Sequence, residues 1–403
     1  MEISNVVRSL SFLLALCWYI PSIYASREAE IEKIHKEIFK SKYTSTIRPP
    51  GTNGNDYVTI TTNMFILDIS SIDDYEMQYT IQLYLRQKWV DERLQFKHLS
   101  ENISHISIND VNVMWTPDLF FVNEIDGNHH QTMKTNQFAR IQANGSVLYS
   151  VKLTLILSCP MKFQLYPFDH QKCPLRIESY GWSKKDLLLK FDETQAIQLN
   201  PKLRVQEFDL YKVIPSTEEV SLSTGTFIVL EVGFFLLRRI NYFFFHLYIP
   251  TSMLVFTSWT SFWFGPNQVV ARTIIGMSTF FITINLITSF NVGLPKVSYI
   301  RAIDVWSGTC LIFVFIAFME FFYVSYTYSK HSQTTNKSSS DDDNALETKD
   351  KSRSDNSKSR IPLQKWLEKV SDVNSVDKLS RSVFPLAFVL FIVVYFSIYL
   401  SIK

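Results

Sequence analysis

Hydrophobic and polar residues alternate along much of the first half of the chain. The alternation is clearest at 79–89, 146–157 and 202–214, with turn signals such as Asn144-Gly145 between such stretches. Residues 27–40 instead repeat apolar positions at a helical period. Many short strands over a segment of this length are typical of a β-sandwich. We therefore expect 26–238 to form an all-β sandwich preceded by a short helix.

The second half of the chain contains four long stretches almost free of charge. They are Ile240–Ala271, Thr273–Pro295, Val305–Ser329, which only Glu320 interrupts, and Ser382–Ile402. Each supplies the roughly 20 residues that a membrane-spanning helix needs. A soluble core helix is the alternative, and the third stretch is the weakest. We expect an all-α four-helix transmembrane bundle, with helices one to three in 239–328 and helix four in 381–403.

Two further segments set the compartment. Residues 1–25 combine Arg8, an apolar run from Leu10 to Ile20 and small residues near the end, as a secretory signal peptide does. The alternative is a buried N-terminal helix. Residues 329–360 are mainly Ser, Lys and Asp with almost nothing apolar, and 361–370 fit a short amphipathic helix. We expect 329–380 to form a disordered, Lys/Arg-rich cytoplasmic loop. Four crossings would leave both ends of the mature chain outside the cell, in a multi-pass plasma-membrane protein.

An oxidising compartment changes how the four cysteines are interpreted. Cys17 lies in the predicted signal peptide and Cys310 in an apolar stretch. Cys159 and Cys173 are the remaining pair, so we expect them to form a disulfide, with two free thiols as the alternative. Asn102 and Asn144 begin Asn-x-Ser sequons and are candidate glycosylation sites.

Composition excludes several functions. The net charge of +2 gives no sign of a nucleic-acid partner, and neither a G-x-S-x-G, an H-E-x-x-H nor a P-loop sequence occurs. We expect no enzyme activity, no cofactor and no metal site. The neighbouring His129 and His130 are interpreted as a solvated pair, because no third ligand has a recognisable spacing.

The second uncharged stretch is unusually polar for a helix in lipid. One helical face carries residues at intervals of three and four. They are Ile274, Ser278, Phe281, Asn285 and Thr288. Such a face suits a pore, with Phe281 as a dry constriction, although helix–helix contact is an alternative. One helix cannot enclose a pore, so this interpretation requires several subunits around an axis.

Several motifs together identify a family. The sequence "CPMKFQLYPFDHQKC" (159–173) resembles the signature loop of the Cys-loop, or pentameric, ligand-gated ion channels. So do "WTPDLFF" (115–121), "RRINYFFFHLYIP" (238–250) and "LPKVSYIRAID" (294–304), in order along 55–402. The stretches "CPLRIESYGW" (173–182) and "ARTIIGMST" (271–279) resemble the GABA and glycine-type anion channels. The resemblance implies a neurotransmitter receptor subunit in a lipid bilayer with four further subunits, identical or homologous, and a postsynaptic setting.

The resemblance also implies a small-molecule agonist pocket between subunits. One face would carry Phe120, Glu178, Tyr180, Thr224 and Phe227, and the other Tyr84, Arg86 and Lys152. Glu178 would pair with an ammonium and the cations with a carboxylate, which favours GABA ahead of biogenic amines. Leu222 and Val229 depart from the aromatic and the Arg of GABA-binding subunits. Protons or zinc acting at His98, His105, His129 and His130 are an alternative.

Selectivity and gating residues follow by the same resemblance. The anion-channel Pro-Ala-Arg is Val270-Ala271-Arg272 here, and Ala271 stands where cation channels carry Glu. We expect a ring of Arg272 side chains to favour chloride. Gating would be coupled through Asp73, Asp74, Asp169, Arg238 and Lys296. A cation channel, an accessory subunit and a non-conducting adhesion protein are the alternatives.

Overall fold

The structure is a computed structural model that describes residues 27–39, 43–51, 56–100, 102–265, 268–342 and 373–401. The predicted signal peptide lies outside the described residues. The chain divides into two compact units, one of 1–161 with 172–236 and the other of 162–171 with 237–403. We call them the sheet unit and the helical unit and describe each by itself.

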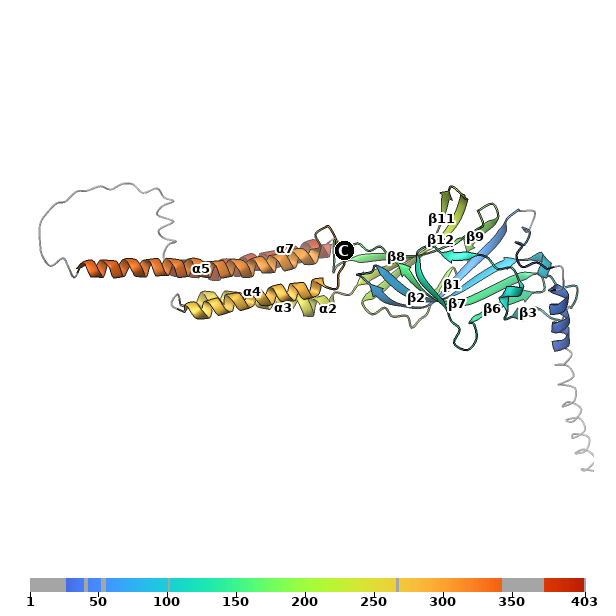
Figure 1. The fold of residues 1–403 in the computed structure, drawn as a ribbon, viewed down its shortest axis with the longest axis horizontal. Coiled ribbons are helices and arrows are strands. Elements are labelled where there is room, and N and C mark those ends of the chain that lie inside the picture. The colour runs from blue at the N-terminus through green and yellow to red at the C-terminus, as the bar shows by residue number, and fades with distance from the viewer. Residues whose placement is uncertain are drawn as a thin grey trace, which may run out of the picture. The chain divides into compact units, whose positions relative to one another are not determined.

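The sheet unit contains twelve strands in two sheets in its described part (Figure 1). The larger sheet has the order β10-β1-β2-β7-β6-β3, with β5 paired to β7 and β9 to β1, and the smaller has the order β11-β12-β8-β4. Its strands are β1 (Val58–Asp73), β2 (Gln78–Val90), β3 (His105–Ile108), β4 (Leu119–Phe121), β5 (Glu124–His129), β6 (Gln137–Gln142), β7 (Ser146–Ser158), β8 (His170–Ser179), β9 (Leu187–Phe191), β10 (Ile197–Leu199), β11 (Phe208–Leu222) and β12 (Gly225–Arg238). Residues 27–38 form a helix before them. The expected sandwich with its N-terminal helix is confirmed.

Alternation along the strands produces the core. Buried and half-exposed residues alternate along β2, so Leu83 and Leu85 point into the core and Tyr84 and Arg86 point outward. The predicted strands at 79–89 and 146–157 match β2 and β7 closely. The third, at 202–214, is wrong at its start because Asn200 first makes a turn. Its carbonyl accepts from the Leu203 amide at 2.9 Å, and the strand begins only at Phe208.

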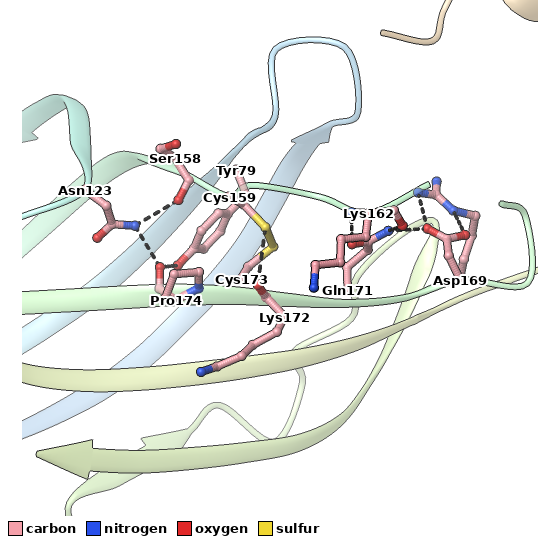
Figure 2. Close-up of a disulfide and its surroundings, with 11 residues drawn as sticks. Tyr79, Asn123, Ser158, Cys159, Lys162, Asp169, Gln171, Lys172, Cys173 and Pro174 are labelled. Carbon is pink, nitrogen blue, oxygen red and sulfur yellow. Dashed lines mark hydrogen bonds and ion pairs between the residues drawn. A yellow bond between two sulfur atoms is a disulfide. The ribbon is translucent and has the colours of Figure 1, made fainter. Parts of the chain in front are cut away.

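The predicted disulfide is confirmed. Cys159 and Cys173 are bonded, with their Cα atoms 4.8 Å apart, and both are buried (Figure 2). The carbonyl of Pro174 beside it accepts hydrogen bonds from the Tyr79 hydroxyl at 2.9 Å and the Asn123 amide at 2.8 Å. These bonds tie the disulfide to β2 and to the β4–β5 turn within the sheet unit.

The helical unit contains the four predicted apolar stretches. Three of its helices, at Val269–Asn291, Ala302–Ser329 and Val376–Ser401, are long and apolar enough to cross a membrane. They belong to α4 (Val269–Asn291), α5 (Ala302–Asp342) and α7 (Val373–Ser401) (Figure 1). The remaining stretch is a succession of short pieces: α2 (Asn241–Phe243), the π-helix η3 (Phe244–Tyr248), α3 (Ile249–Trp259) and the 3₁₀-helix η4 (Thr260–Trp263). Pro250 cannot donate to the preceding turn, which explains why the helix widens just before it.

The predicted limits of the polar loop differ from the structure. Helix α5 continues to Asp342 instead of ending near 328, and α7 begins at Val373 instead of 381. Adding a residue to an existing helix is far easier than starting one, so polar residues can extend α5 beyond its apolar part. Residues 343–372 lie outside the described part of the chain.

Candidate functional site

Three neighbouring strands bring one half of the predicted agonist site together. Phe120 on β4 lies directly opposite Glu178 on β8, and Phe227 lies on β12, the next strand of that sheet. The Phe120 and Tyr180 rings meet edge to face with centroids 5.6 Å apart. Tyr180 is 79% exposed, whereas Phe227 is buried. The result is an aromatic surface with one ring free to contact a ligand.

Asp118 fixes the turn that presents Tyr180. Its carboxylate accepts from the Ser179 hydroxyl at 2.6 Å and the Gly181 amide at 2.7 Å, and its carbonyl accepts from the Tyr180 amide at 3.2 Å. Sequence reasoning missed Asp118 and Ser179 as site residues. The signal was present, since an Asp after Pro117 and a Ser before an aromatic are typical turn-forming side chains.

Glu178 supplies the negative charge of this surface. Only 8% of the residue is exposed, and its carboxylate accepts no hydrogen bond from any residue in the described part of the chain. Burial raises the pKa of this carboxyl. A carboxylate in such partly desolvated surroundings, without a protein partner, would be stabilised by a ligand cation.

This environment predicts a pH dependence of agonist potency. Extracellular pH is lowered here from neutral toward 4.5, the ordinary glutamate pKa. Because its pKa is raised, Glu178 gains its proton at a higher pH than an ordinary glutamate does. Its attraction for an ammonium group is then lost. The half-effective agonist concentration should therefore increase on acidification. Glu178→Gln should raise it about 10- to 100-fold at neutral pH, the value of a charged hydrogen bond, and should remove the pH dependence.

The matched control is the exposed Glu218→Gln on β11, which should keep both the potency and the pH dependence. Whole-cell dose–response curves at several pH values provide the measurement. An unaltered pH dependence in Glu178→Gln would exclude this carboxyl as the titrating group.

Other residues near β12 have different exposures. Thr224, in the β11–β12 turn, is exposed. Leu222 is 55% exposed, whereas Val229 is buried in the sheet unit. A side chain at 222 can therefore reach a ligand on this surface, and a side chain at 229 in the Val229 orientation cannot.

The other half of the predicted site lies on the larger sheet. Tyr84 on β2 is directly opposite Lys152 on β7, and Arg86 is two residues along the same face. The Arg86 guanidinium donates to Asn63 Oδ1 at 3.2 Å and lies over the Phe65 ring, 5.8 Å from its centroid. Sequence reasoning missed Asn63 and Phe65, although alternation along β1 places both on the outward face. The two halves occupy different sheets, so their meeting across neighbouring subunits stays a prediction.

Helix α4 exposes the face that the sequence singled out. In the single subunit Ile274 is 62% exposed and Phe281 54% exposed. Ser278, Asn285 and Thr288 are exposed as well. Their polar groups donate back to carbonyls of the same helix, as Asn285 does to Phe281 at 2.9 Å. The face is thus available to line a pore without unpaired donors, and that it does so stays a prediction.

Arg272 differs from its expected role. Its guanidinium is fully buried and paired with Asp377 of α7 at 2.8 Å, so it does not lie on the exposed face. Successive helical residues are turned by about 100°, so Arg272 is about 200° from Ile274 around α4. It shares the buried stripe with Gly276, Thr279 and Thr283. The expectation that Arg272 side chains form a positive ring in the pore is wrong for this structure; Ala271 beside it is half-buried.

The loop of residues 162–171 is bound tightly within the helical unit. Asp169 pairs with Arg238 at 2.9 Å, both side chains being almost fully buried, and accepts from Gln171 at 2.5 Å (Figure 2). Phe168 stacks on Tyr399 of α7 with centroids 6.2 Å apart. The Ala302 amide, at the start of α5, donates to the Gln164 carbonyl at 3.0 Å. The loop therefore contacts the ends of two long helices.

The remaining predicted coupling residues lie in loops. Asp73 accepts the Tyr75 and Glu76 amides at 2.8 and 3.1 Å and so closes the β1–β2 turn of the sheet unit, which also contains Asp74. Lys296, in the helical unit after α4, is exposed. Their part in gating stays a prediction.

Comparison with known proteins assigns the sequences of the sheet unit and of the helical unit to one family. Residues 31–237 match the neurotransmitter-gated ion-channel ligand binding domain, and residues 247–364 match the neurotransmitter-gated ion-channel transmembrane region. The chain belongs to the neurotransmitter-gated ion channels. It is also 39% identical over 311 residues to a glutamate-gated chloride channel of Drosophila melanogaster, covering 77% of this chain and 68% of the relative.

Membership of this family confirms several expectations. The chain is a subunit of a neurotransmitter-gated, membrane-spanning channel, and it is not an enzyme. The two matched regions correspond to the sheet unit and to most of the helical unit. Asn102 and Asn144 are both exposed in the sheet unit, and their glycosylation stays a prediction.

Proposed function

We propose that this chain is a subunit of a pentameric chloride channel opened by an amino acid that binds between the sheet units of neighbouring subunits. The observation that carries the proposal is Glu178, a largely buried residue whose carboxylate has no hydrogen-bond partner among the described residues, beside the exposed ring of Tyr180. An ammonium group would satisfy the carboxylate and lie against the aromatic faces. The exposed Thr224 would complete that side of the pocket, and the buried Phe227 would support it from within the sheet unit.

The opposite side of the pocket supports a ligand with more than one carboxylate. Arg86 and Lys152 are diagonal neighbours across β2 and β7, about 7 Å apart at their Cβ atoms. Two cations can each pair with one carboxylate of glutamate, whereas GABA has a single carboxylate. The chain also resembles a channel named for glutamate. We therefore rank glutamate first and GABA, which the sequence favoured, second.

The proposed chloride selectivity does not depend on Arg272 side chains that face the permeating ion. Helix α4 contains no Asp or Glu, so no acidic ring faces the permeating ion from it. The helix also begins near its predicted cytoplasmic end, where the unpaired amide groups carry a partial positive charge. Five such ends around an axis would favour anions. The relative's name, a chloride channel, agrees with this reasoning.

The proposed setting follows from the predicted topology. The sheet unit and both ends of the mature chain would face the extracellular side of the plasma membrane, at a postsynaptic site by family resemblance. Agonist binding would act on the loop 162–171 and the β1–β2 turn around Asp73 and Asp74. These would move the linker that bears Lys296 and then α4.

A ligand panel on cells that express the full chain tests this proposal. L-glutamate should open a current at lower concentration than GABA, and the reversal potential should follow the chloride gradient. Replacing external chloride by gluconate should shift the reversal potential by about 58 mV for each tenfold change in the external chloride concentration. A reversal potential that follows sodium would contradict the selectivity, and currents opened only by protons or zinc would contradict the agonist.

A further inference from the structure

Arg272 lies at the centre of a buried polar cluster that joins the membrane segments. Its guanidinium forms two contacts with the Asp377 carboxylate, at 2.8 and 3.3 Å, and Nε donates to the Phe264 carbonyl at 3.1 Å. The side chain of Arg272 has no exposed surface and that of Asp377 is 6% exposed. Arg272 therefore connects α4 to α7 through Asp377 and to the end of the first membrane segment through the Phe264 carbonyl.

A second arginine, Arg381 of α7, caps the end of the first membrane segment. Arg381 donates to the Phe262 carbonyl at 2.8 and 3.1 Å and lies over the Trp263 ring. The last carbonyls of a helical segment have no partner within it, so a guanidinium there satisfies groups that would otherwise be buried unpaired. The beginning of α7 thus holds η4 by Arg381 and α4 by Asp377.

Glu320 of α5 adds a second carboxyl to the cluster. Its Oε1 is 3.5 Å from the Ser380 hydroxyl, and its Oε2 is buried without a hydrogen-bond partner among the described residues. It also interacts electrostatically with Asp377 and Arg272. Without the Arg272 charge, two acidic side chains would lie together in a buried place, which is unfavourable unless one of them is neutralised.

A close contact on the same buried stripe of α4 explains why this cluster matters for the pore. Gly276, one turn from Arg272, lies so close to α5 that an added Cβ would be 2.3 Å from the Phe318 ring. Rotating α4 about its axis would separate Arg272 from Asp377 and would drive other side chains into Phe318. The pair and the close contact together fix which face of α4 is exposed.

We propose that Asp377 is a positioning residue, which holds Arg272 away from the pore and thereby keeps the face from Ile274 to Thr288 turned toward it. The assignment of that face to a pore rests on the proposed function. The role of Arg272 is then to orient α4, and not to present its charge to permeating ions. A pore-charge role would make Arg272 independent of Asp377.

A double-mutant cycle on the full-length purified oligomer tests the proposal without needing an agonist. The variants are Arg272→Gln, Asp377→Asn and the two combined, with the exposed neighbour Lys378→Gln as the matched control. Each single variant should lower the thermal midpoint, Arg272→Gln by on the order of 10 °C. The thermal midpoint of the double variant should be equal to or higher than that of Arg272→Gln, because the two introduced amides can hydrogen-bond to each other. The thermal midpoint of Lys378→Gln should match that of the parent. Losses that add in the double variant would overturn the pairing.

A second measurement separates positioning from stability alone. In a Cys310→Ala background, Ile274→Cys should react with a small charged thiol reagent, and Asp377→Asn should change that rate several-fold as α4 turns. The double variant should restore the rate toward the parent. An unchanged rate in Asp377→Asn would overturn the positioning role.

If Asp377→Asn yields no protein, recovery of surface protein in the double variant takes the place of the rate measurement. Absence of that recovery would overturn the proposal. If the chain conducts no chloride, the proposed function is contradicted. The double-mutant cycle of thermal midpoints still tests the pairing of Arg272 with Asp377, because it does not depend on conduction.

Discussion

Asp169→Asn should nearly abolish agonist-evoked current, with a decrease of at least tenfold. The carboxylate of Asp169 and the guanidinium of Arg238 form two contacts, at 2.9 and 3.2 Å, and their side chains are 2% and 1% exposed. Removing one charge of such a pair leaves the other buried without compensation, which costs about 3–5 kcal/mol. The Arg238 guanidinium also lies 4.6 Å from the centre of the Tyr166 ring, so its displacement disturbs the loop on both sides.

The position of the pair explains why this loss affects gating as well as folding. Carbonyls of the loop 162–171 accept from the first amides of α5, and Phe168 stacks on α7. Arg238 directly precedes the first membrane segment. In the proposed mechanism this loop transmits agonist binding to α4. A loop that no longer holds Arg238 should lower coupling even in channels that reach the surface.

Surface biotinylation measured beside current distinguishes the two effects. Lys184→Ala, which breaks an ion pair whose side chains are 42% and 54% exposed, is the matched control and should leave both measurements unchanged. The combined Asp169→Asn and Arg238→Gln variant should recover part of the surface protein, because no charge remains unpaired. Normal dose–response curves in Asp169→Asn would contradict the role of the pair.

Local patterns were sufficient to predict the framework of this channel. Alternation found β2 and β7, whose outward residues Tyr84, Arg86 and Lys152 share one face as expected. The helical period found the exposed face of α4, and the compartment argument found the disulfide. In each case the information lies within a few residues of the chain or in a single composition signal.

Contacts between distant residues were not predictable in the same way. Asp377, which neutralises Arg272, is 105 residues away along the chain, beyond a polar loop. A resemblance of sequence had assigned the Arg272 charge to the pore, although the helical period alone turns it away from Ile274. Asp118 was visible within "WTPDLFF", but its bonds to Ser179 and Gly181 depend on the pairing of β4 with β8.

Phe281→Ser should produce a chloride current without agonist, amounting to about a tenth or more of the maximal agonist current. Phe281 is the only large aromatic on the exposed face from Ile274 to Thr288, between Ser278 and Asn285. In the proposed pentamer five phenyl rings would meet there and exclude water from the closed pore. Burying one Phe contributes roughly 1.5–3 kcal/mol, so five hydroxyls in place of five rings remove a large part of what favours the closed state. A tenfold shift toward opening takes only about 1.4 kcal/mol.

Phe280→Ser is the matched control for this prediction, because it removes the same ring one residue away. Phe280 is half-buried and contacts Phe315 of α5, with centroids 6.0 Å apart, so its loss should reduce surface protein and not open the pore. The measurement is the holding current before agonist is applied, normalised to the amount of surface protein. Replacing chloride by another anion identifies the part of this current that chloride carries. A silent Phe281→Ser channel at normal surface level would place the gate at another residue of α4. Equal leak in both variants would mean that loosened packing of α4 opens the channel, because only one of the two rings faces the proposed pore.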